Sequence, residues 1–431
     1  MKIWQKKHTN TSATIDKFTV GRDKEFDLLL AKYDVQGSLA HAQMLYSIGL
    51  LTQLEWEQIE IALTAILKTI EVETFQLDEE VEDIHSQIEL MLTQQIGETG
   101  KKIHSGRSRN DQVLVDIKLY LRAETKHLAQ QVNGLFEQLL QLSDTHKNKL
   151  LPGYTHFQLA MPSSFGLWFA AYAESLLDDM EWIRAAYNMN NKNPLGSGAG
   201  YGSSFPLNRT LTTELLQFES MNYNVVYAQM TRGKSEKAMA TALAAVAATL
   251  SKFAYDVCLY MNQNFGFITF PDELTTGSSI MPHKKNPDAF ELIRAKCNRI
   301  QALPNELTLL TNNLPSGYHR DMQLTKEILF PAIEELHSCL EITGFMLEHI
   351  ILKEDILHND KYAHLFSVER VNEMVLEGTP FRDAYKMVGQ EIEQGTFKAP
   401  DQLNHTHEGS IGNLCNDKIR EQMQQFQYLF Q

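Results

Sequence analysis

The pattern of apolar positions along the chain is helical over most of its length. From Asp111 to about Lys147, apolar residues recur every three or four positions with one gap of seven, as on one face of an α-helix. At 1.5 Å per residue, this segment predicts a rod of roughly 55 Å. A rod of that length needs neighbours, so the pattern predicts a bundle. The apolar residues are Val113, Ile117, Leu121, Leu128, Val132, Leu135 and Leu139.

Further long helices are predicted from similar spacing, while period-two strand runs bounded by turn residues are scarce. In one of them, the string AMATALAAVAATL places small side chains on all faces. Small residues permit close helix approach, so we expect a central, fully buried helix there. The fold class is therefore all-α. The predicted long helices span residues 163–191, 232–263, 287–312 and 321–352.

Helix-breaking stretches divide the chain into three predicted domains. Residues 1–108 hold shorter amphipathic helices, such as 25–48 and 52–70, and end in the glycine-punctuated GETGKKIHSGRSRN. Residues 109–355 hold the long helices and form a central bundle domain. Residues 356–431 carry shorter periodic stretches, which predict a small C-terminal helical domain.

Composition narrows the function classes. The 431 residues are 43% hydrophobic, enough for a large core, and the net charge is −15 without any run of five basic residues. We therefore expect no nucleic-acid or membrane partner. The four cysteines lie far apart with no CxxC pair, which disfavours a disulfide framework or a zinc site. The N-terminal stretch lacks the apolar core of a signal peptide, and the longest apolar run, Ala238–Leu250, is too short to cross a bilayer. The expected location is the cytoplasm.

The stretch GSSIMPHKKNPD, residues 277–288, carries the densest candidate chemistry. Gly277 permits turn conformations, and Pro282 and Pro287 prevent a continuous helix, so a loop is predicted. Its polar groups suit a substrate that becomes more negative as it reacts. The alternative is a solvated connection between two helices. The groups are two hydroxyls, two ammoniums and a carboxamide, from Ser278, Ser279, Lys284, Lys285 and Asn286.

Two other loops sit at predicted helix ends. In HSGRSRNDQV, Arg107, Arg109 and Asn110 precede the first long helix. A helix N-terminus beside two arginines is an anion site. The alternative is that Asn110 or Asp111 caps the helix and the arginines are solvated. In PGYTHFQLAMPS, Thr155 stands beside His156 between two prolines; a surface or structural histidine is the alternative there.

Two weaker patterns complete the set. The glycines of PLGSGAGYGSS resemble a phosphate cradle, but no strand precedes them and no Lys-Ser or Lys-Thr pair follows. A flexible or close-approach loop is predicted instead. In PSGYHRDMQLTKE, which also holds Tyr318, Gln323 and Lys326 are three positions apart and share a helix face. A solvated helix start is the alternative.

Taken together, three of these strings resemble a known family. HSGRSRNDQV, GYTHFQLAMP and GSSIMPHKKNPD resemble the signature regions of the fumarase and aspartase superfamily, and within it those of the argininosuccinate lyase family. The resemblance runs from YDVQGSLAHAQML through EDIHSQIE to YHRDMQ and is less distinct over the last 70 residues.

This resemblance implies a fold, an assembly and a reaction. The fold is a long-helix bundle, and the assembly is a homotetramer with a central twenty-helix bundle and active sites built from loops of three subunits. The reaction is the reversible β-elimination of argininosuccinate to arginine and fumarate. The resemblance implies a small-molecule substrate. It implies that the reaction needs neither a metal nor an organic cofactor.

The resemblance also implies residue roles. Ser278 corresponds to the proton-abstracting serine, and His156, backed by Glu291, to the family's histidine. Lys284 and Asn286 are placed to meet the charge of the aci-carboxylate intermediate. Because a serine hydroxyl is a poor base, Ser278 needs ionisation by Lys284, by backbone amides or by loop closure. The implied substrate-binding residues are Arg109, Asn110, Thr155, Ser279, Asn286, Tyr318, Gln323 and Lys326.

One departure and two alternatives remain. Many relatives have a serine in the N-terminal segment, where this chain reads FTVGRDKEFD, so that Gly21 or Asp23 occupies the region. One alternative is another fumarate-releasing lyase of the superfamily, acting on adenylosuccinate, fumarate or aspartate. The other is a catalytically silent structural protein of the crystallin kind.

Overall fold

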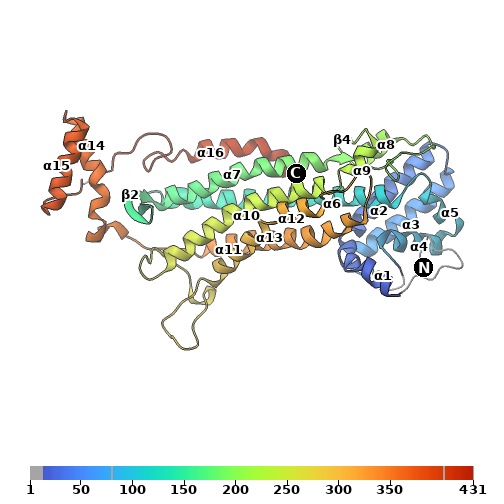
Figure 1. Cartoon of the computed structure of the whole chain (residues 1–431), viewed down its shortest axis with the longest axis horizontal. Coiled ribbons are helices and arrows are strands. Elements are labelled where there is room, and N and C mark those ends of the chain that lie inside the picture. The colour runs from blue at the N-terminus through green and yellow to red at the C-terminus, as the bar shows by residue number, and fades with distance from the viewer. Residues whose placement is uncertain (1–12, 79–80, 401–402, 431) are drawn as a thin grey trace. The chain divides into compact units, whose positions relative to one another are not determined.

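The computed structural model describes residues 13–78, 81–400 and 403–430 (Figure 1). The first twelve residues lie outside the described residues. They include most of the N-terminal stretch in which the sequence shows no apolar core of a signal peptide. Contacts divide the chain into two compact units, and α6, α7, α10, α11 and α13 contribute to both. Unit 1 comprises residues 1–128, 182–245 and 299–336, and unit 2 comprises residues 129–181, 246–298 and 337–431. The three-domain division stays a prediction.

Helices dominate the described chain, as predicted. The longest, α6, spans Arg109–His146, close to the predicted rod. The other α-helices are α1 (Ala13–Val20), α2 (Asp23–Ser47), α3 (Gln53–Glu71), α4 (Ile84–Ile96), α5 (Glu98–Lys101), α7 (Phe165–Asn190), α8 (Arg209–Leu215), α9 (Val225–Met230), α10 (Lys234–Met261), α11 (Asp288–Ile300), α12 (Leu303–Leu310), α13 (Leu324–Glu348), α14 (Ser367–Leu376), α15 (Phe381–Glu393) and α16 (Asn416–Met423).

Short 3-10 helices and strands fill some of the connections. The 3-10 helices are η1 (Lys102–His104), η2 (Asp272–Leu274), η3 (Arg320–Gln323), η4 (Ile356–His358), η5 (Asp360–Phe366) and η6 (Gln424–Leu429). The strands pair as β1 (Leu150–Thr155) with β2 (Gln158–Ser164), β3 (Lys192–Asn193) with β4 (Ser220–Met221), and β5 (Ile268–Thr269) with β6 (Ile351–Leu352). Among the described strands, β3 and β4 run parallel and the other two pairs run antiparallel.

In unit 1, the helices α2, α3 and α4 enclose an apolar core. Thr52 caps α3 in a reciprocal capping box with Glu55, which satisfies the free backbone donors at the start of that helix. Ile59 and Leu63 of α3 are fully buried in the cluster. Asp83 caps α4 by accepting a hydrogen bond from the backbone N–H of Ser86. This cap fixes the residues that begin α4.

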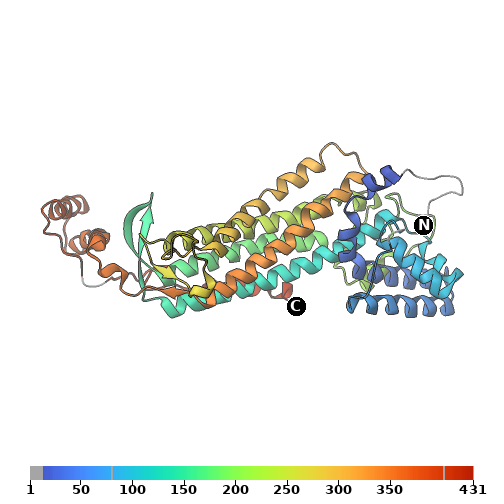
Figure 2. The same cartoon turned by 90° about the horizontal axis from the view of Figure 1, so that it is seen from below.

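In unit 2, aromatic side chains fill the core beside the β1–β2 hairpin. Trp168 of α7 stacks on Phe253 of α10 with ring centroids 5.3 Å apart. Asp256 accepts hydrogen bonds from Trp168 Nε1 at 3.1 Å and from the Tyr172 hydroxyl at 2.7 Å. Partly buried polar groups paired in this way hold the helices in a defined register. Figure 2 shows β1 and β2 as a two-stranded ribbon.

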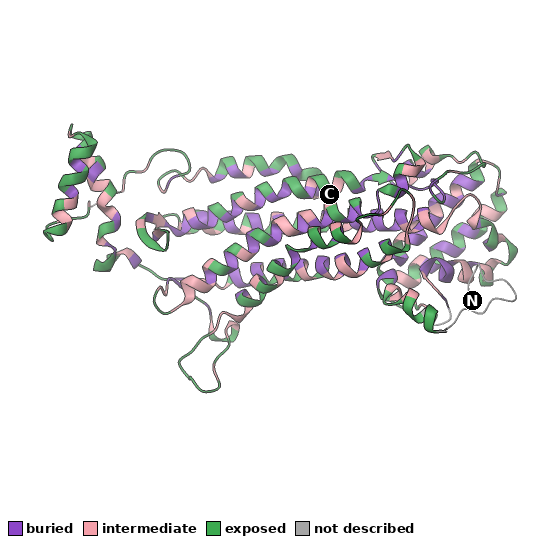
Figure 3. Cartoon of the chain, viewed as in Figure 1, coloured by how far each residue is buried: buried purple, intermediate pink, exposed green. Residues whose placement is uncertain are grey.

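The helix rich in small residues differs from its prediction. Figure 3 shows exposed stretches between the buried ones along α10. Ala242 and Val246 are fully buried, but Ala248 is exposed and Tyr255 is 45% exposed. In a single chain, α10 is therefore not buried on all faces. The stretch Val225–Met261 is long and apolar enough to cross a membrane by length and composition, and half of its most apolar part is buried inside the fold. Core helices of soluble proteins meet the same criterion.

Candidate active site

A polar pocket in unit 1 gathers five of the predicted substrate-binding residues. These are Arg109, Asn110, Tyr318, Gln323 and Lys326. The start of α6 supplies the first two, and the segment that runs from Tyr318 through η3 into α13 supplies the others. Positions about 200 residues apart in sequence thus line one cavity. The remaining lining residues are Val20, Asp23, Asp27, Glu82, Asp83, His85, Val113, Arg232 and Arg320.

The start of α6 is fixed by a capping arrangement that differs from the predicted one. α6 begins at Arg109, so neither Asn110 nor Asp111 is its N-cap. Ser108 occupies that place: its Oγ accepts from the Asn110 backbone N–H at 3.3 Å, and its own N–H donates to Asp111 Oδ1 at 2.9 Å. The alternative of a cap at Asn110 or Asp111 was wrong because the helix starts earlier than its apolar stripe.

The glycine-rich stretch supports this helix start. Asp111 is fully buried, and its Oδ2 accepts from the backbone N–H groups of Gly196 and Gly198, both at 2.9 Å. Both glycines have positive φ, 83° and 60°, which favours glycine over other residues. The prediction of a close-approach loop is confirmed. The loop holds the α6 N-terminus, and with it Asn110, at the pocket.

Lys326 lies between two carboxylates. Its Nζ is 2.7 Å from Asp23 Oδ1 and 2.5 Å from Asp27 Oδ1. The Lys326 side chain is only 4% exposed. Burial alone would lower the pKa of Lys326, but Asp27 and Asp23 raise it overall, so the amine is an ammonium at neutral pH. Of the two residues that occupy the region of the family's serine, Asp23 lines the pocket and Gly21 does not.

Arg109 and Gln323 are held by neighbouring groups of the protein. Arg109 Nη1 lies 3.0 Å from Asp83 Oδ2 and 3.3 Å from Glu82 Oε2. Gln323 Nε2 donates to the carbonyls of Thr19 and Val20, at 3.0 and 3.2 Å. These contacts brace the pocket wall and join the end of α1 to η3. Arg107 donates to Ser38 Oγ at 2.9 Å and is not among the lining residues.

His85 is a pocket residue that was not singled out from the sequence. It is buried, and its Nδ1 is hydrogen-bonded to Asp34 Oδ2. Burial alone would lower the pKa of His85, but Asp34 raises it overall. Asp116 lies behind the pair, 3.6 Å from Nδ1, and burial together with the charge of Asp34 raises the pKa of Asp116 well above its usual range. The signal was present in the string EDIHSQIE, but a lone histidine on a helix face is usually structural.

The other predicted residues lie in unit 2, and two of them lie at the β1–β2 turn. His156 and Phe157 have positive φ, 54° and 58°, between the paired residues Thr155 and Gln158. Positive φ at both central positions is typical of a tight two-residue hairpin turn. Thr155 and His156 are therefore presented at an exposed tip rather than in an irregular loop.

The GSSIMPHKKNPD stretch is a loop, as predicted, closed at its base by a bridge between Thr276 and Asn286. The Oγ of Ser278 accepts from the backbone N–H groups of Ile280 and Met281, at 3.3 and 3.1 Å. Lys285 pairs with Asp272. The exposed side chains of the loop include Ser279 and Lys284, and Glu291 is exposed in the first turn of α11. Among the described residues, no hydrogen bond joins His156 to Glu291, so that pairing stays a prediction.

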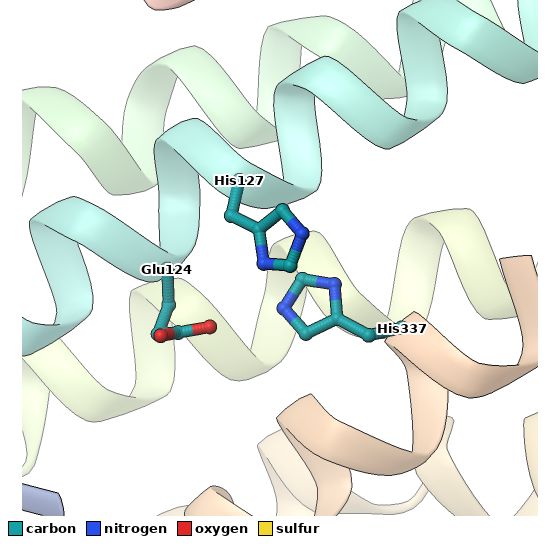
Figure 4. Close-up of side chains that lie close together, drawn as sticks. All are labelled: Glu124, His127 and His337. Atoms are coloured by element: carbon teal, nitrogen blue, oxygen red, sulfur yellow. The ribbon is translucent and has the colours of Figure 1, made fainter. Parts of the chain in front are cut away.

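The long helices also carry polar side chains that do not line the pocket. Glu124 and His127 stand one turn apart on α6 and point toward the same side of that helix (Figure 4). In unit 2, His337 Nδ1 donates to Gln131 Oε1. None of Cys258, Cys297, Cys339 and Cys415 forms a disulfide in the described part of the chain.

Comparisons with known proteins identify the family. A family model described as lyase matches residues 6–302. The argininosuccinate lyase of Bacteroides thetaiotaomicron is 59% identical over 424 residues, covering 98% of this chain and 95% of its own. That of Thermotoga neapolitana is 38% identical, covering 90% and 98% of the two chains.

Solved structures agree on the fold. EDDS lyase in complex with formate superposes with a TM-score of 0.75 at 20% identity, covering 98% of this chain and 91% of its own. Class II fumarase from Schistosoma mansoni does so with a TM-score of 0.72 at 15% identity, covering 94% and 90%. The predicted all-α fold class is confirmed. The chain is a member of the argininosuccinate lyase family within the fumarase and aspartase superfamily.

Proposed function

We propose that the chain catalyses the reversible β-elimination of argininosuccinate to arginine and fumarate, in the cytoplasm and as a homotetramer. The observation that carries the proposal is the 58–60% identity, over 98% of this chain, to proteins named argininosuccinate lyase. The pocket supports it, because Lys326, Tyr318 and Gln323 meet there as the family resemblance requires.

The chemistry begins at a carbon-bound proton. Ser278 removes the proton next to a carboxylate of the succinyl part, which builds an aci-carboxylate dianion. The C–N bond then breaks, the electron pair leaves with the guanidino nitrogen, and fumarate forms. Two backbone N–H groups already donate to Ser278 Oγ. The same donors stabilise an alkoxide and lower the cost of ionising the hydroxyl.

The remaining loop residues stabilise the charge of the intermediate and transfer the proton of the leaving group. Lys284 and Asn286 stabilise the dianion through an ammonium and an amide donor. His156, oriented by Glu291, handles the proton of the departing nitrogen. Thr155, Ser279 and Asn286, with the pocket residues of unit 1, bind the substrate's carboxylates and its arginine part.

An exposed helix face in the single chain supports the proposed tetramer. The exposed side of α10, with Ala248 and Tyr255, lies on a helix whose small residues suit close packing against another helix. In the proposed assembly, copies of α10 pack together, and each active site takes its loops from three copies.

The test measures fumarate absorbance with purified protein and one substrate at a time. Argininosuccinate is expected to yield fumarate, and adenylosuccinate, malate and aspartate are not. Release from adenylosuccinate but not from argininosuccinate would assign a different lyase of the superfamily. No release from any substrate, by protein verified as folded and tetrameric, would favour the structural role.

A further inference from the structure

The environment of Lys326 holds one more carboxylate than the ammonium needs. Asp27 is almost fully buried, 3% exposed, and lies 2.5 Å from Lys326 Nζ. That contact already supplies a buried counter-charge. Asp23 adds a second carboxylate at 2.7 Å and is 19% exposed at the pocket. The three groups together carry a net charge of −1.

Apart from Lys326, the cations that line the pocket pair with other groups. Arg109 pairs with Glu82 and Asp83, and Arg232 pairs with Glu236 at 2.9 Å. Asp23 Oδ1 is buried, and its one described partner is Lys326, which it shares with Asp27. Burial raises the pKa of Asp23 to about 6, against the opposing effect of Lys326 and with a further rise from Asp27. Two carboxylates that share one buried ammonium leave one negative charge in excess, and a cationic ligand group would compensate it.

We propose that Asp23 binds the α-ammonium group of the arginine part and thereby selects α-amino acids over compounds that lack this group. The inference rests on the proposed function and adds a specificity residue to it. In many relatives, the sequence resemblance places a serine in this region; a carboxylate offers a full charge instead of a hydroxyl dipole.

The geometry of an amino acid fits this arrangement. Lys326 has three N–H donors, and its two described ion pairs use two of them. The third is available for a ligand carboxylate. In an α-amino acid, the nitrogen and the carboxylate carbon are about 2.5 Å apart because both are bonded to the same carbon. A carboxylate held by Lys326 therefore brings the α-ammonium within reach of the carboxylates flanking that lysine, and Asp23 is the one exposed to the pocket.

The side-chain replacements that test this are mild. Asp23→Asn keeps the shape and removes the charge, and Asp27 still neutralises Lys326. Asp23→Ser is the second variant, which covers the case in which Asn disturbs folding. The matched control is Glu25→Gln on the same helix, because Glu25 is exposed and pairs with Arg22 outside the pocket.

The assay runs the reaction in the direction of synthesis, with fumarate and one of three guanidines at pH 7.5. Arginine has both the ammonium and the carboxylate, agmatine lacks the carboxylate, and 5-guanidinopentanoate lacks the ammonium. In Asp23→Asn, kcat/KM for arginine and for agmatine is expected to fall at least about tenfold, mainly through KM, as for a lost charged hydrogen bond. In the same variant, kcat/KM for 5-guanidinopentanoate should change less than about threefold. Glu25→Gln should leave kcat/KM unchanged for all three guanidines.

Each outcome decides the matter. An equal loss for arginine and 5-guanidinopentanoate would mean that Asp23 only shapes the pocket, and no loss for arginine would mean that it makes no contact. Either result overturns the inference. If the unmodified protein forms no product from arginine and fumarate while it releases fumarate from another substrate, the proposed function itself is wrong.

Discussion

A buried lysine away from the candidate chemistry allows a quantitative test of the fold. Lys118 lies on α6, is fully buried, and has no carboxylate within ion-pair distance among the described residues. Its Nζ donates to Asn222 Oδ1 at 3.0 Å and to the Met189 carbonyl at 3.5 Å. Burial lowers the pKa of Lys118 from 10.5 to about 7. We predict that Lys118→Met stabilises the protein at neutral pH.

The magnitude follows from the pKa. Between pH 7 and 10.5 the unfolded chain keeps this amine protonated while the folded chain releases the proton, so stability rises with pH across that window. At 1.4 kcal/mol per pKa unit, the cost of burying Lys118 at pH 7 is on the order of 4 kcal/mol. Methionine has a similar length and no charge. It leaves the acceptors on Asn222 and Met189 without this donor, at about 1 kcal/mol each, and the expected net gain is about 2 kcal/mol.

Thermal unfolding followed by circular dichroism measures the effect between pH 6.5 and 9.5. Scan rate and protein concentration are held constant, because the stability of an oligomer depends on both. The advantage of Lys118→Met should be largest near pH 7 and shrink toward pH 9.5. Lys147→Met, at an exposed position, is the matched control and should shift the midpoint little. A Lys118→Met protein that is less stable at pH 7, or whose advantage does not depend on pH, would refute the reasoning.

Three further predictions concern the site. Ser278→Ala should abolish turnover while argininosuccinate still binds, as measured by single-turnover kinetics and calorimetry, because it removes a group used in the transition state; an unchanged kcat would end its role as base. Glu236→Gln should lower the free energy of unfolding by about 3 kcal/mol in urea titrations, because it leaves the buried Arg232 without its carboxylate, and an unchanged midpoint would show that this ion pair contributes nothing. KM for arginine should rise as pH falls below about 6, where Asp23 beside Lys326, Asp27 and Arg232 becomes protonated; Asp23→Asn should lack that rise, and a profile identical to that of the unmodified protein would contradict the assignment.

The sequence pattern was most informative where packing repeats regularly. The apolar stripe beginning at Val113 predicted α6 to within two residues at either end. The prolines and glycine of GSSIMPHKKNPD predicted a loop, and the structure has one. The predicted helix over residues 287–312 is instead two helices, α11 and α12, because the helical pattern alone did not show the break after Ile300.

The parts that sequence did not predict depend on contacts between distant residues. His85 belongs to the pocket because α4 begins at a cap that points this residue inward, next to Asp34. The sequence left Gly21 and Asp23 as alternatives for the region of the family's serine. The ion pair of Asp23 with Lys326, more than 300 positions away, distinguishes Asp23 from Gly21. The tight turn at His156 places His156 and Phe157 in the left-handed region of backbone conformation. Neither is glycine, asparagine or aspartate, so the sequence gave no turn signal there.

The central claim is that one active site draws Ser278 and His156 from different copies of the chain. Mixing inactive Ser278→Ala and His156→Asn proteins under conditions that exchange subunits tests it directly. The account predicts that argininosuccinate cleavage returns in the mixed tetramers, well above either variant alone, because some sites then contain both intact residues. Mixed tetramers that are isolated through tags on both chains, and that remain as inactive as their parents, would contradict it.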